Sequence, residues 1–178
     1  MNILLLSGSP HKNGTTARLI DAFVRGAQEA GHTVERVDAA SKSIGGCLGC
    51  QACRNNGGFC VQKDDMEQIY PKLERAEGVV LVTPLYYFGM SAQLKLLLDR
   101  WYAVNPALRA ASKKAALLSA GADREDWAMA ALRGQYEALI RYLDWEDRGT
   151  LLVLGASTPQ DLDSRQELEQ ARMLGKNF

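Results

Sequence analysis

The sequence predicts an α/β fold in which five parallel strands form one doubly wound sheet with helices on both faces. Short runs of branched apolar residues recur along the chain, and several are apolar throughout, as strands buried on both faces are. Segments with helical periodicity separate these runs, which is typical of strands joined by crossover helices. The expected strands are residues 3–6, 34–37, 79–82, 115–118 and 151–154.

The expected helices are defined by apolar side chains that recur every three or four residues. This pattern covers residues 17–27, 66–73, 94–101 and 136–143, and Asp64 and Glu67 have the spacing of a capping box. A last helical segment after Ser164 has only a weak apolar stripe. The pattern does not encode the strand order, and 2-1-3-4-5 is the natural expectation for a five-stranded sheet of this kind.

Length and composition indicate a single domain over residues 1–178, with a cysteine-rich loop at 45–63. The chain has 21 basic and 21 acidic residues and no block of like charge, which disfavours a nucleic-acid partner. The opening MNILLL is short and has no basic residue, and no apolar run approaches membrane-spanning length. We therefore expect no signal peptide, no membrane partner and a cytoplasmic location, where cysteines serve metal or redox chemistry more often than disulfides.

The loop after the first expected strand has the composition of an anion site. Gly8 and Gly14 permit tight turns, and Ser9, Thr15 and Thr16 supply hydroxyl groups where a helix begins. A Walker loop would need lysine where Thr15 stands, and G-x-G-x-x-G is absent. A ligand with one phosphate therefore fits better than a triphosphate or a pyrophosphate, and the alternative is a capped turn without a ligand.

Three stretches resemble the NADPH-dependent FMN reductase family, a flavodoxin-like group, and they cover roughly the first hundred residues in the family's order. They are SGSPHKNGTT, CVQKDDMEQIY and VTPLYYFGMSAQLKLLLDRW. The resemblance implies a flavodoxin-like fold that binds FMN. It also implies phosphate contacts at Ser9, His11, Asn13, Gly14, Thr15 and Thr16.

The stretch after the third strand is predicted to form the wall of the flavin ring. Such a ring needs an apolar, partly aromatic wall and backbone groups that hydrogen bond to its edge. We expect these from Pro84, Leu85, Tyr86, Tyr87, Phe88 and Gly89, with Gly121 beside the ring edge. The alternative for each aromatic residue alone is ordinary core packing.

All four cysteines fall in one short stretch with the spacing C-x2-C-x2-C-x6-C: Cys47, Cys50, Cys53 and Cys60. Tight spacing of this kind lets one loop wrap a [4Fe–4S] cluster, whereas structural zinc more often uses two separated pairs. The motif resembles that of the iron–sulfur flavoproteins, a branch of the same family, which implies a [4Fe–4S] cluster beside FMN and an oligomer. The alternative is a thiol-bearing loop that covers the flavin pocket or a subunit contact.

These expectations combine into an FMN-dependent oxidoreductase. NAD(P)H, or a reduced protein such as ferredoxin, would supply electrons to a small acceptor (a quinone, a flavin or a metal species) or to the cluster. No acid–base side chain is required, so no catalytic residue is predicted, and we expect a homodimer or homotetramer. The alternative is a non-catalytic flavodoxin-type electron carrier, which the neutral charge of the chain disfavours.

Overall fold

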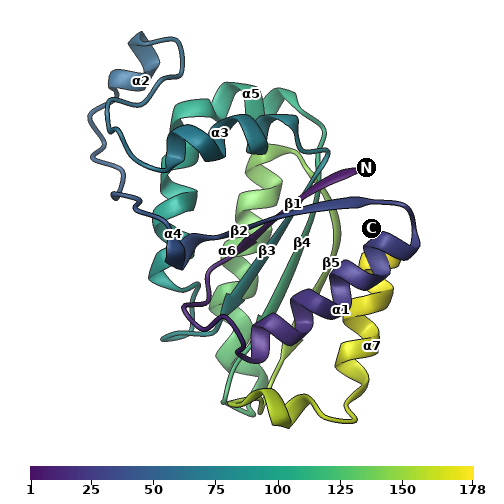
Figure 1. Ribbon diagram of the computed structural model, residues 1–178. Coiled ribbons are helices and arrows are strands. Elements are labelled where there is room, and N and C mark those ends of the chain that lie inside the picture. Colours follow the sequence, from purple (N-terminus) through teal and green to yellow (C-terminus); the bar gives the residue numbers. More distant parts are fainter.

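The computed structural model describes residues 1–178 and contains one sheet of five parallel strands in the order β2-β1-β3-β4-β5 (Figure 1). The strands are β1 (Asn2–Ser7), β2 (Thr33–Asp38), β3 (Gly78–Pro84), β4 (Lys114–Ala120) and β5 (Glu146–Val153). The predicted fold class and strand order are confirmed. Only β5 differs clearly in extent, because this edge strand begins with the polar residues Glu146 and Asp147, which are exposed, and Arg148, which is half-buried, and has no apolar run there.

Helices cover both faces of the sheet (Figure 1). Helices α1 (Thr15–Glu29) and α7 (Gln166–Lys176) lie on one face. The other face carries α3 (Met66–Arg75), α4 (Ala92–Asp99), α5 (Asn105–Ala110) and α6 (Ala130–Leu143). The short elements are α2 (Ala52–Asn55) and the 3₁₀ turns η1 (Ala39–Ser41), η2 (Arg100–Val104), η3 (Asp126–Met129) and η4 (Pro159–Leu162). None of the helices combines the length and the apolar character that crossing a bilayer requires.

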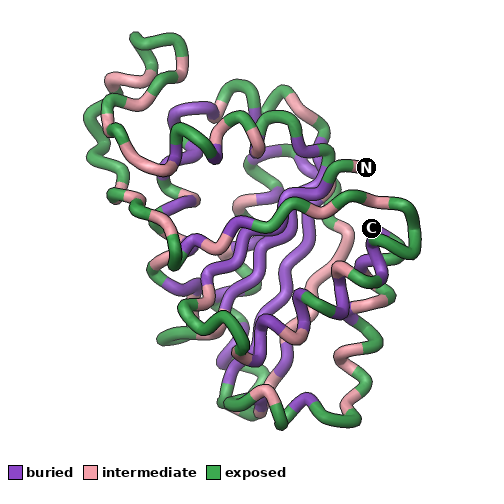
Figure 2. Tube along the Cα trace, viewed as in Figure 1, coloured by how far each residue is buried: buried purple, intermediate pink, exposed green.

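The central strands are apolar over most of their length because both of their faces are buried (Figure 2). In β1, Leu4 and Leu6 pack in the cluster formed with α3, α4 and α6. Ile3 and Leu5 point the other way, into the cluster formed with α1 and α7. The two-residue period of a strand thus divides one apolar run between two cores.

Helices α1 and α7 approach each other more closely than ordinary side chains allow. Any Cβ atom at Gly26 would overlap the carbonyl of Arg172, and one at Gly175 would overlap the carbonyl of Phe23. The weak apolar stripe of the last segment had not indicated this contact. Small residues, rather than large apolar ones, let α7 pack against α1.

We therefore expect Gly26→Ala to lower the free energy of unfolding by about 1–3 kcal/mol, because the added methyl group forces the two helices apart. Urea unfolding followed by circular dichroism measures this change. Gly134→Ala in α6 is the matched control, since no atom lies within 4 Å of its new Cβ. The control should raise stability by up to about 1 kcal/mol through helix propensity. Equal stability of the two variants would contradict the close-packing argument.

Candidate functional site

The loops that follow β1, β3, β4 and β5 surround a cleft of about 680 Å³ at the carboxyl edge of the sheet. This is the edge at which parallel α/β sheets bind ligands. The residues that line the cleft are Ser9, Pro10, His11, Lys12, Asn13, Gly14, Thr15, Thr16, Pro84, Leu85, Tyr86, Ala120, Gly121, Ala122, Ala156, Ser157, Thr158 and Pro159. All of the predicted flavin-site residues are among them except Tyr87, Phe88 and Gly89.

One end of the cleft has the donors that a phosphate needs. Helix α1 begins here, and its N-cap residue Gly14 provides no side chain to satisfy the first amide groups. Thr16 is 2% exposed, and its buried Oγ1 has no hydrogen-bond partner within the protein. A buried hydroxyl without a partner costs free energy, and a phosphate oxygen against the helix terminus would satisfy it. The residues at this end therefore fit the phosphate group of FMN.

A buried serine holds the phosphate loop against the exit of β3. Ser91 donates from Oγ to the carbonyl oxygen of Gly8 (2.8 Å), and its amide donates to Oγ1 of Thr83 (2.9 Å). The same Oγ accepts the amide of Leu94 (3.4 Å) and so caps α4. The amide of Gly8 donates to Val82 (2.8 Å), and a Cβ atom on Gly8 would collide with Ser91. Glycine is therefore required by the close approach of these two loops.

The residues that follow β3 were predicted to form the wall of the flavin ring, and the structure places only some of them in the cleft. Pro84, Leu85 and Tyr86 line the cleft, but Tyr87, Phe88 and Gly89 do not. Reciprocal backbone hydrogen bonds between Tyr86 and Gly89 close a tight turn, and φ is positive at Tyr87 (45°) and Phe88 (63°). The turn directs Tyr87 into solvent, where it is fully exposed.

The expected backbone donors to a flavin ring are also largely occupied. The amide of Leu85 donates to Ala120 (2.9 Å), that of Tyr86 to Gly89 (3.2 Å), and that of Gly121 to Val153 (2.9 Å). The bonds of Leu85 and Gly121 fasten the ends of β3, β4 and β5 to one another, and the bond of Tyr86 closes the turn within its own loop. The cleft residues of these loops therefore contribute shape more than free amide groups.

The sequence analysis did not identify residues 156–159, which close the cleft after β5. The amides of Ser157 and Thr158 donate to the carboxylate of Asp161 (2.8 and 2.7 Å), which fixes this loop. The sequence could have indicated this loop, because it follows the last strand of a parallel sheet and so emerges at the edge where ligands bind.

The four cysteines lie around one small cavity of about 20 Å³, together with Arg100, and none forms a disulfide. No group of three or more His, Cys, Asp or Glu side chains is placed to hold a single metal ion. A four-iron cluster attaches each thiolate to a different iron atom and so spreads its ligands more widely than one ion does. The donor set fits such a cluster, but the cavity is about the size of one water molecule, so the loop must widen to admit it.

A buried ion pair anchors the beginning of the cysteine loop. Arg100 donates to both carboxylate oxygens of Asp64 (2.5 and 3.2 Å), and it is 1% exposed. Burial alone would raise the pKa of Asp64, but hydrogen bonds from Arg100 and from the amides of Gly45 and Met66 outweigh it and hold that pKa below its ordinary value. The predicted capping box is wrong: the N-cap of α3 is Asp65, which makes no side-chain cap hydrogen bond, and Glu67 pairs with Lys63 instead (2.9 Å).

The cysteine loop does not cover the cleft of its own chain. The cleft and the cysteine cavity share no lining residue, and Figure 1 shows the α2 segment projecting well away from the loop between β1 and α1. Of the alternatives for a thiol-bearing loop, a cover over this chain's own flavin pocket is therefore wrong.

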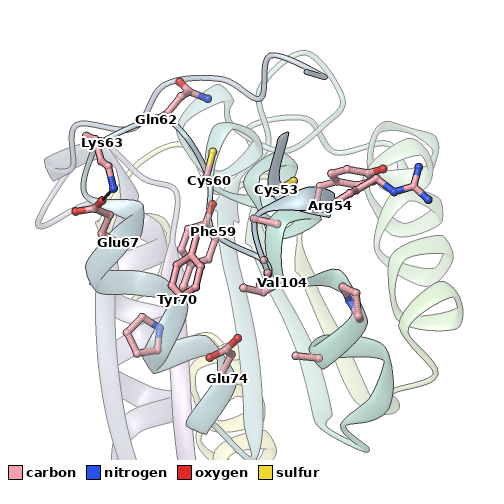
Figure 3. A pocket seen from close by; sticks show the side chains of 17 residues that line it. Cys53, Arg54, Phe59, Cys60, Gln62, Lys63, Glu67, Tyr70, Glu74 and Val104 are labelled. Carbon is pink, nitrogen blue, oxygen red and sulfur yellow. Dashed lines mark ion pairs between the residues drawn. The ribbon is translucent and has the colours of Figure 1, made fainter. Parts of the chain in front are cut away.

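A larger cavity of about 830 Å³ lies between the cysteine loop and helices α3 and α5 (Figure 3). Cys53 and Cys60 reach it from the loop, and Tyr70 and Phe59 contribute aromatic rings. Burial raises the pKa of Tyr70 to about 12, so its hydroxyl stays protonated and donates to the carbonyl of Arg100 (3.1 Å). The helix that begins at this cavity is α5, which is six residues long and has Pro106 in its first turn, so it offers fewer free amide groups to a phosphate than α1 does. The smaller cleft therefore fits a flavin phosphate better than this larger cavity.

Comparison with known proteins finds sequence matches over most of the chain. The sequence profile of the NADPH-dependent FMN reductase family matches residues 1–141. The chain is 34% identical to an iron–sulfur flavoprotein of Methanosarcina thermophila, over 87% of this chain and 78% of that protein. It is 36% identical to an iron–sulfur flavoprotein of Archaeoglobus fulgidus over 61% of this chain, but the match spans only half of that relative.

Solved structures show the same fold. An NAD(P)H:quinone oxidoreductase from Methanothermobacter marburgensis superimposes with a TM-score of 0.77 at 21% identity, over 99% of this chain and 95% of that one. A flavone reductase also gives a TM-score of 0.77, at 19% identity, over 99% of this chain and 61% of that one.

We expect Ser91→Ala to lower the free energy of unfolding by about 1–3 kcal/mol, because it leaves the buried carbonyl of Gly8 without its donor. Chemical unfolding of the protein without ligand measures the loss. Ser119→Ala is the matched control, since Ser119 is equally buried but its hydroxyl has no partner. The control should change stability by less than about 0.5 kcal/mol. A loss as large for Ser119 as for Ser91 would refute the assigned role.

Proposed function

The chain belongs to the NADPH-dependent FMN reductase family, and from this premise we propose that it is an FMN-dependent oxidoreductase. In this proposal NAD(P)H, or a reduced protein such as ferredoxin, supplies electrons to a small acceptor, namely a quinone, a flavin or a metal species, or to an iron–sulfur cluster. The names of the relatives and of the solved structures support the reaction class. Within this class, the identities of the donor and the acceptor are part of the proposal.

The observation that carries the proposal is the unpartnered hydroxyl of Thr16 at the start of α1. It lies in the cleft where Ser9, Gly14 and Thr15 also meet, and Thr15 is itself only 9% exposed. Buried hydroxyl groups and a helix N-terminus together favour a dianionic phosphate ester over a neutral ligand.

The protein's own contribution is to bind and orient. Thr15, Thr16 and the first turn of α1 would hold the phosphate of FMN, and Pro84, Leu85, Tyr86 and Gly121 would border its ring. When bound, FMN supplies the hydride and electron transfer chemistry. The hydrogen bonds that fasten Leu85 and Gly121 keep this border rigid, which limits the cost of ordering the site when the ligand binds.

We also propose that the four cysteines hold a [4Fe–4S] cluster, which would supply one-electron transfer. The support is that Cys47, Cys50, Cys53 and Cys60 all line one cavity and that relatives carry the name iron–sulfur flavoprotein. The glycines of the loop, among them Gly49, Gly57 and Gly58 at positive φ, permit the backbone to wrap a compact group.

The FMN proposal predicts that protein saturated with FMN keeps a stoichiometric flavin after desalting and oxidises NADPH or NADH repeatedly with a quinone as acceptor. Turnover beyond a single equivalent separates an enzyme from a flavodoxin-type carrier. The flavin spectrum after desalting and the rate of NAD(P)H loss are the measurements. Protein that elutes without flavin would overturn the assignment.

Replacement of Thr16 provides the specific test of the phosphate site. Thr16→Val keeps the shape but removes the hydroxyl, and a hydrogen bond to a charged group contributes about 1.5–3 kcal/mol. We therefore expect FMN to bind roughly 10-fold or more weakly in a fluorescence titration. Thr16→Ser retains the hydroxyl and should stay close to the unmodified protein; equal affinity of all three would contradict the phosphate site.

The exposed aromatic residues at the rim of the cleft support a homodimer or homotetramer. Tyr87 is fully exposed, and Phe88 packs against Trp127 with ring centroids 5.0 Å apart although Trp127 is 61% exposed. Exposed aromatic side chains that lie together are typical of interaction surfaces, and we infer that a second copy of the chain buries them.

We expect Trp127→Ser to weaken self-association about 10-fold or more, because aromatic side chains dominate interface energies. Size-exclusion chromatography with light scattering over a concentration series measures this change. Tyr142→Ser, which removes an aromatic ring that is 53% exposed elsewhere, is the control. A monomeric parent protein, or equal effects of both variants, would refute this interface.

A further inference from the structure

Arg100 is a charged residue buried beside the cysteines. It is 1% exposed and heads the largest fully buried side chains of the protein. It lines the same small cavity as Cys47, Cys50, Cys53 and Cys60. Burying a guanidinium group is costly, and an apolar side chain of similar volume would generally stabilise the fold as well or better. Its position therefore calls for an explanation beyond the packing of the core.

The ion pair of Arg100 with Asp64 holds the peptide backbone just before the first cysteine. The amide of Gly45 donates to Asp64 (3.0 Å), and the carbonyl of Gly45 accepts from Arg100 (2.9 Å). Both backbone polar groups of Gly45 are thus satisfied by one buried pair. The side chain of Gln62 adds a hydrogen bond to the carbonyl of Gly46 (3.0 Å). These contacts fix the start of the loop two residues before Cys47.

Arg100 also retains an unused donor. Its Nε is buried and has no hydrogen-bond partner within the protein, although both terminal nitrogens are engaged. An unsatisfied donor on a buried cation costs more than one on a neutral group. Asp64, which pairs with both terminal nitrogens of Arg100, does not line the cysteine cavity. Of this ion pair, the cavity wall therefore carries the cationic member.

We propose that Arg100 is a positioning residue for the four-cysteine site that also compensates its negative charge. The inference rests on the cluster in the proposed function. A cluster held by four thiolates is net negative and gains one further negative charge on one-electron reduction. A fixed positive charge in the cavity wall favours the reduced state, because net charge and hydrogen bonding near the sulfur atoms set the potential of such clusters.

The test compares variants of the full chain after anaerobic reconstitution with ferrous iron and sulfide. We expect Arg100→Met to release iron to a chelator roughly 10- to 100-fold faster, as is usual when a residue that supports metal ligands is lost. Its midpoint potential, measured by redox titration followed by electron paramagnetic resonance, should move to a more negative value. Arg100→Lys keeps the charge but loses the two-pronged contact, so it should release iron faster while its potential stays close to that of the parent.

Lys113→Met is the matched control. Lys113 is 4% exposed and donates to the carbonyls of Glu74 and Ala76 at the other end of α3, away from the cysteines. The control should lose stability with no change in potential or in iron release. If Arg100→Met does not fold, unchanged iron release in Arg100→Lys overturns the inference.

The remaining outcomes separate this inference from the proposed function. A parent protein that binds no iron overturns both the cluster proposal and the inference. A parent protein that binds four irons, with Arg100 variants equal to it in iron release and potential, overturns the inference alone.

Discussion

The hydroxyl of Ser91 connects the parts of the protein that make the cleft. It donates to Gly8 in the phosphate loop and accepts from Leu94 in the first turn of α4, while the amide of Ser91 binds Thr83 at the end of β3. The loop after β1 is thereby fixed to the segment that joins β3 to α4, although the two residues of this bond are 83 positions apart in the sequence. Because Gly8 has no side chain, the loop can approach Ser91 closely enough for this bond. This contact holds the loop that leads into α1, and therefore also the proposed phosphate site, against the end of β3.

Much of this edge could be predicted from the sequence, because the pattern that makes buried parallel strands also fixes where their loops emerge. Four of the five strand runs lie within observed strands, and the residues from Ser9 to Thr16 gather as expected. The turn at Tyr87 and Phe88 could not be predicted, since positive φ is rare for aromatic residues and usually indicates glycine or asparagine. The hydrogen bonds that close this turn are local, between Tyr86 and Gly89, but neither of its central residues is of the type that indicates such a turn.

At the cysteine site, the sequence pattern identifies the residues that lie close together in the chain but not those that tertiary contacts bring to the site. Spacing identifies Cys47, Cys50, Cys53 and Cys60 as a group, and the structure places all four at one cavity. Spacing gives no indication of Arg100, which lies 40 residues beyond Cys60 and meets the loop only through tertiary contacts. Leu94, Leu97 and Trp101 form the core-facing side of this segment. Arg100 is buried beside them, and the ion pair with Asp64 balances its charge there.

The cleft and the cysteine loop differ in how rigid they are before any ligand binds. The cleft is built from strand ends whose backbone groups are already hydrogen bonded, so a ligand meets a rigid wall. The cysteine loop is fastened near Gly45 and again near Gln62, while between them Leu48 and Phe59 remain 70% and 74% exposed. Anchored ends with a loosely packed middle allow the cavity to widen without disturbing the sheet. A loop of this construction can gain order from what it binds, whereas the cleft must have its order before binding.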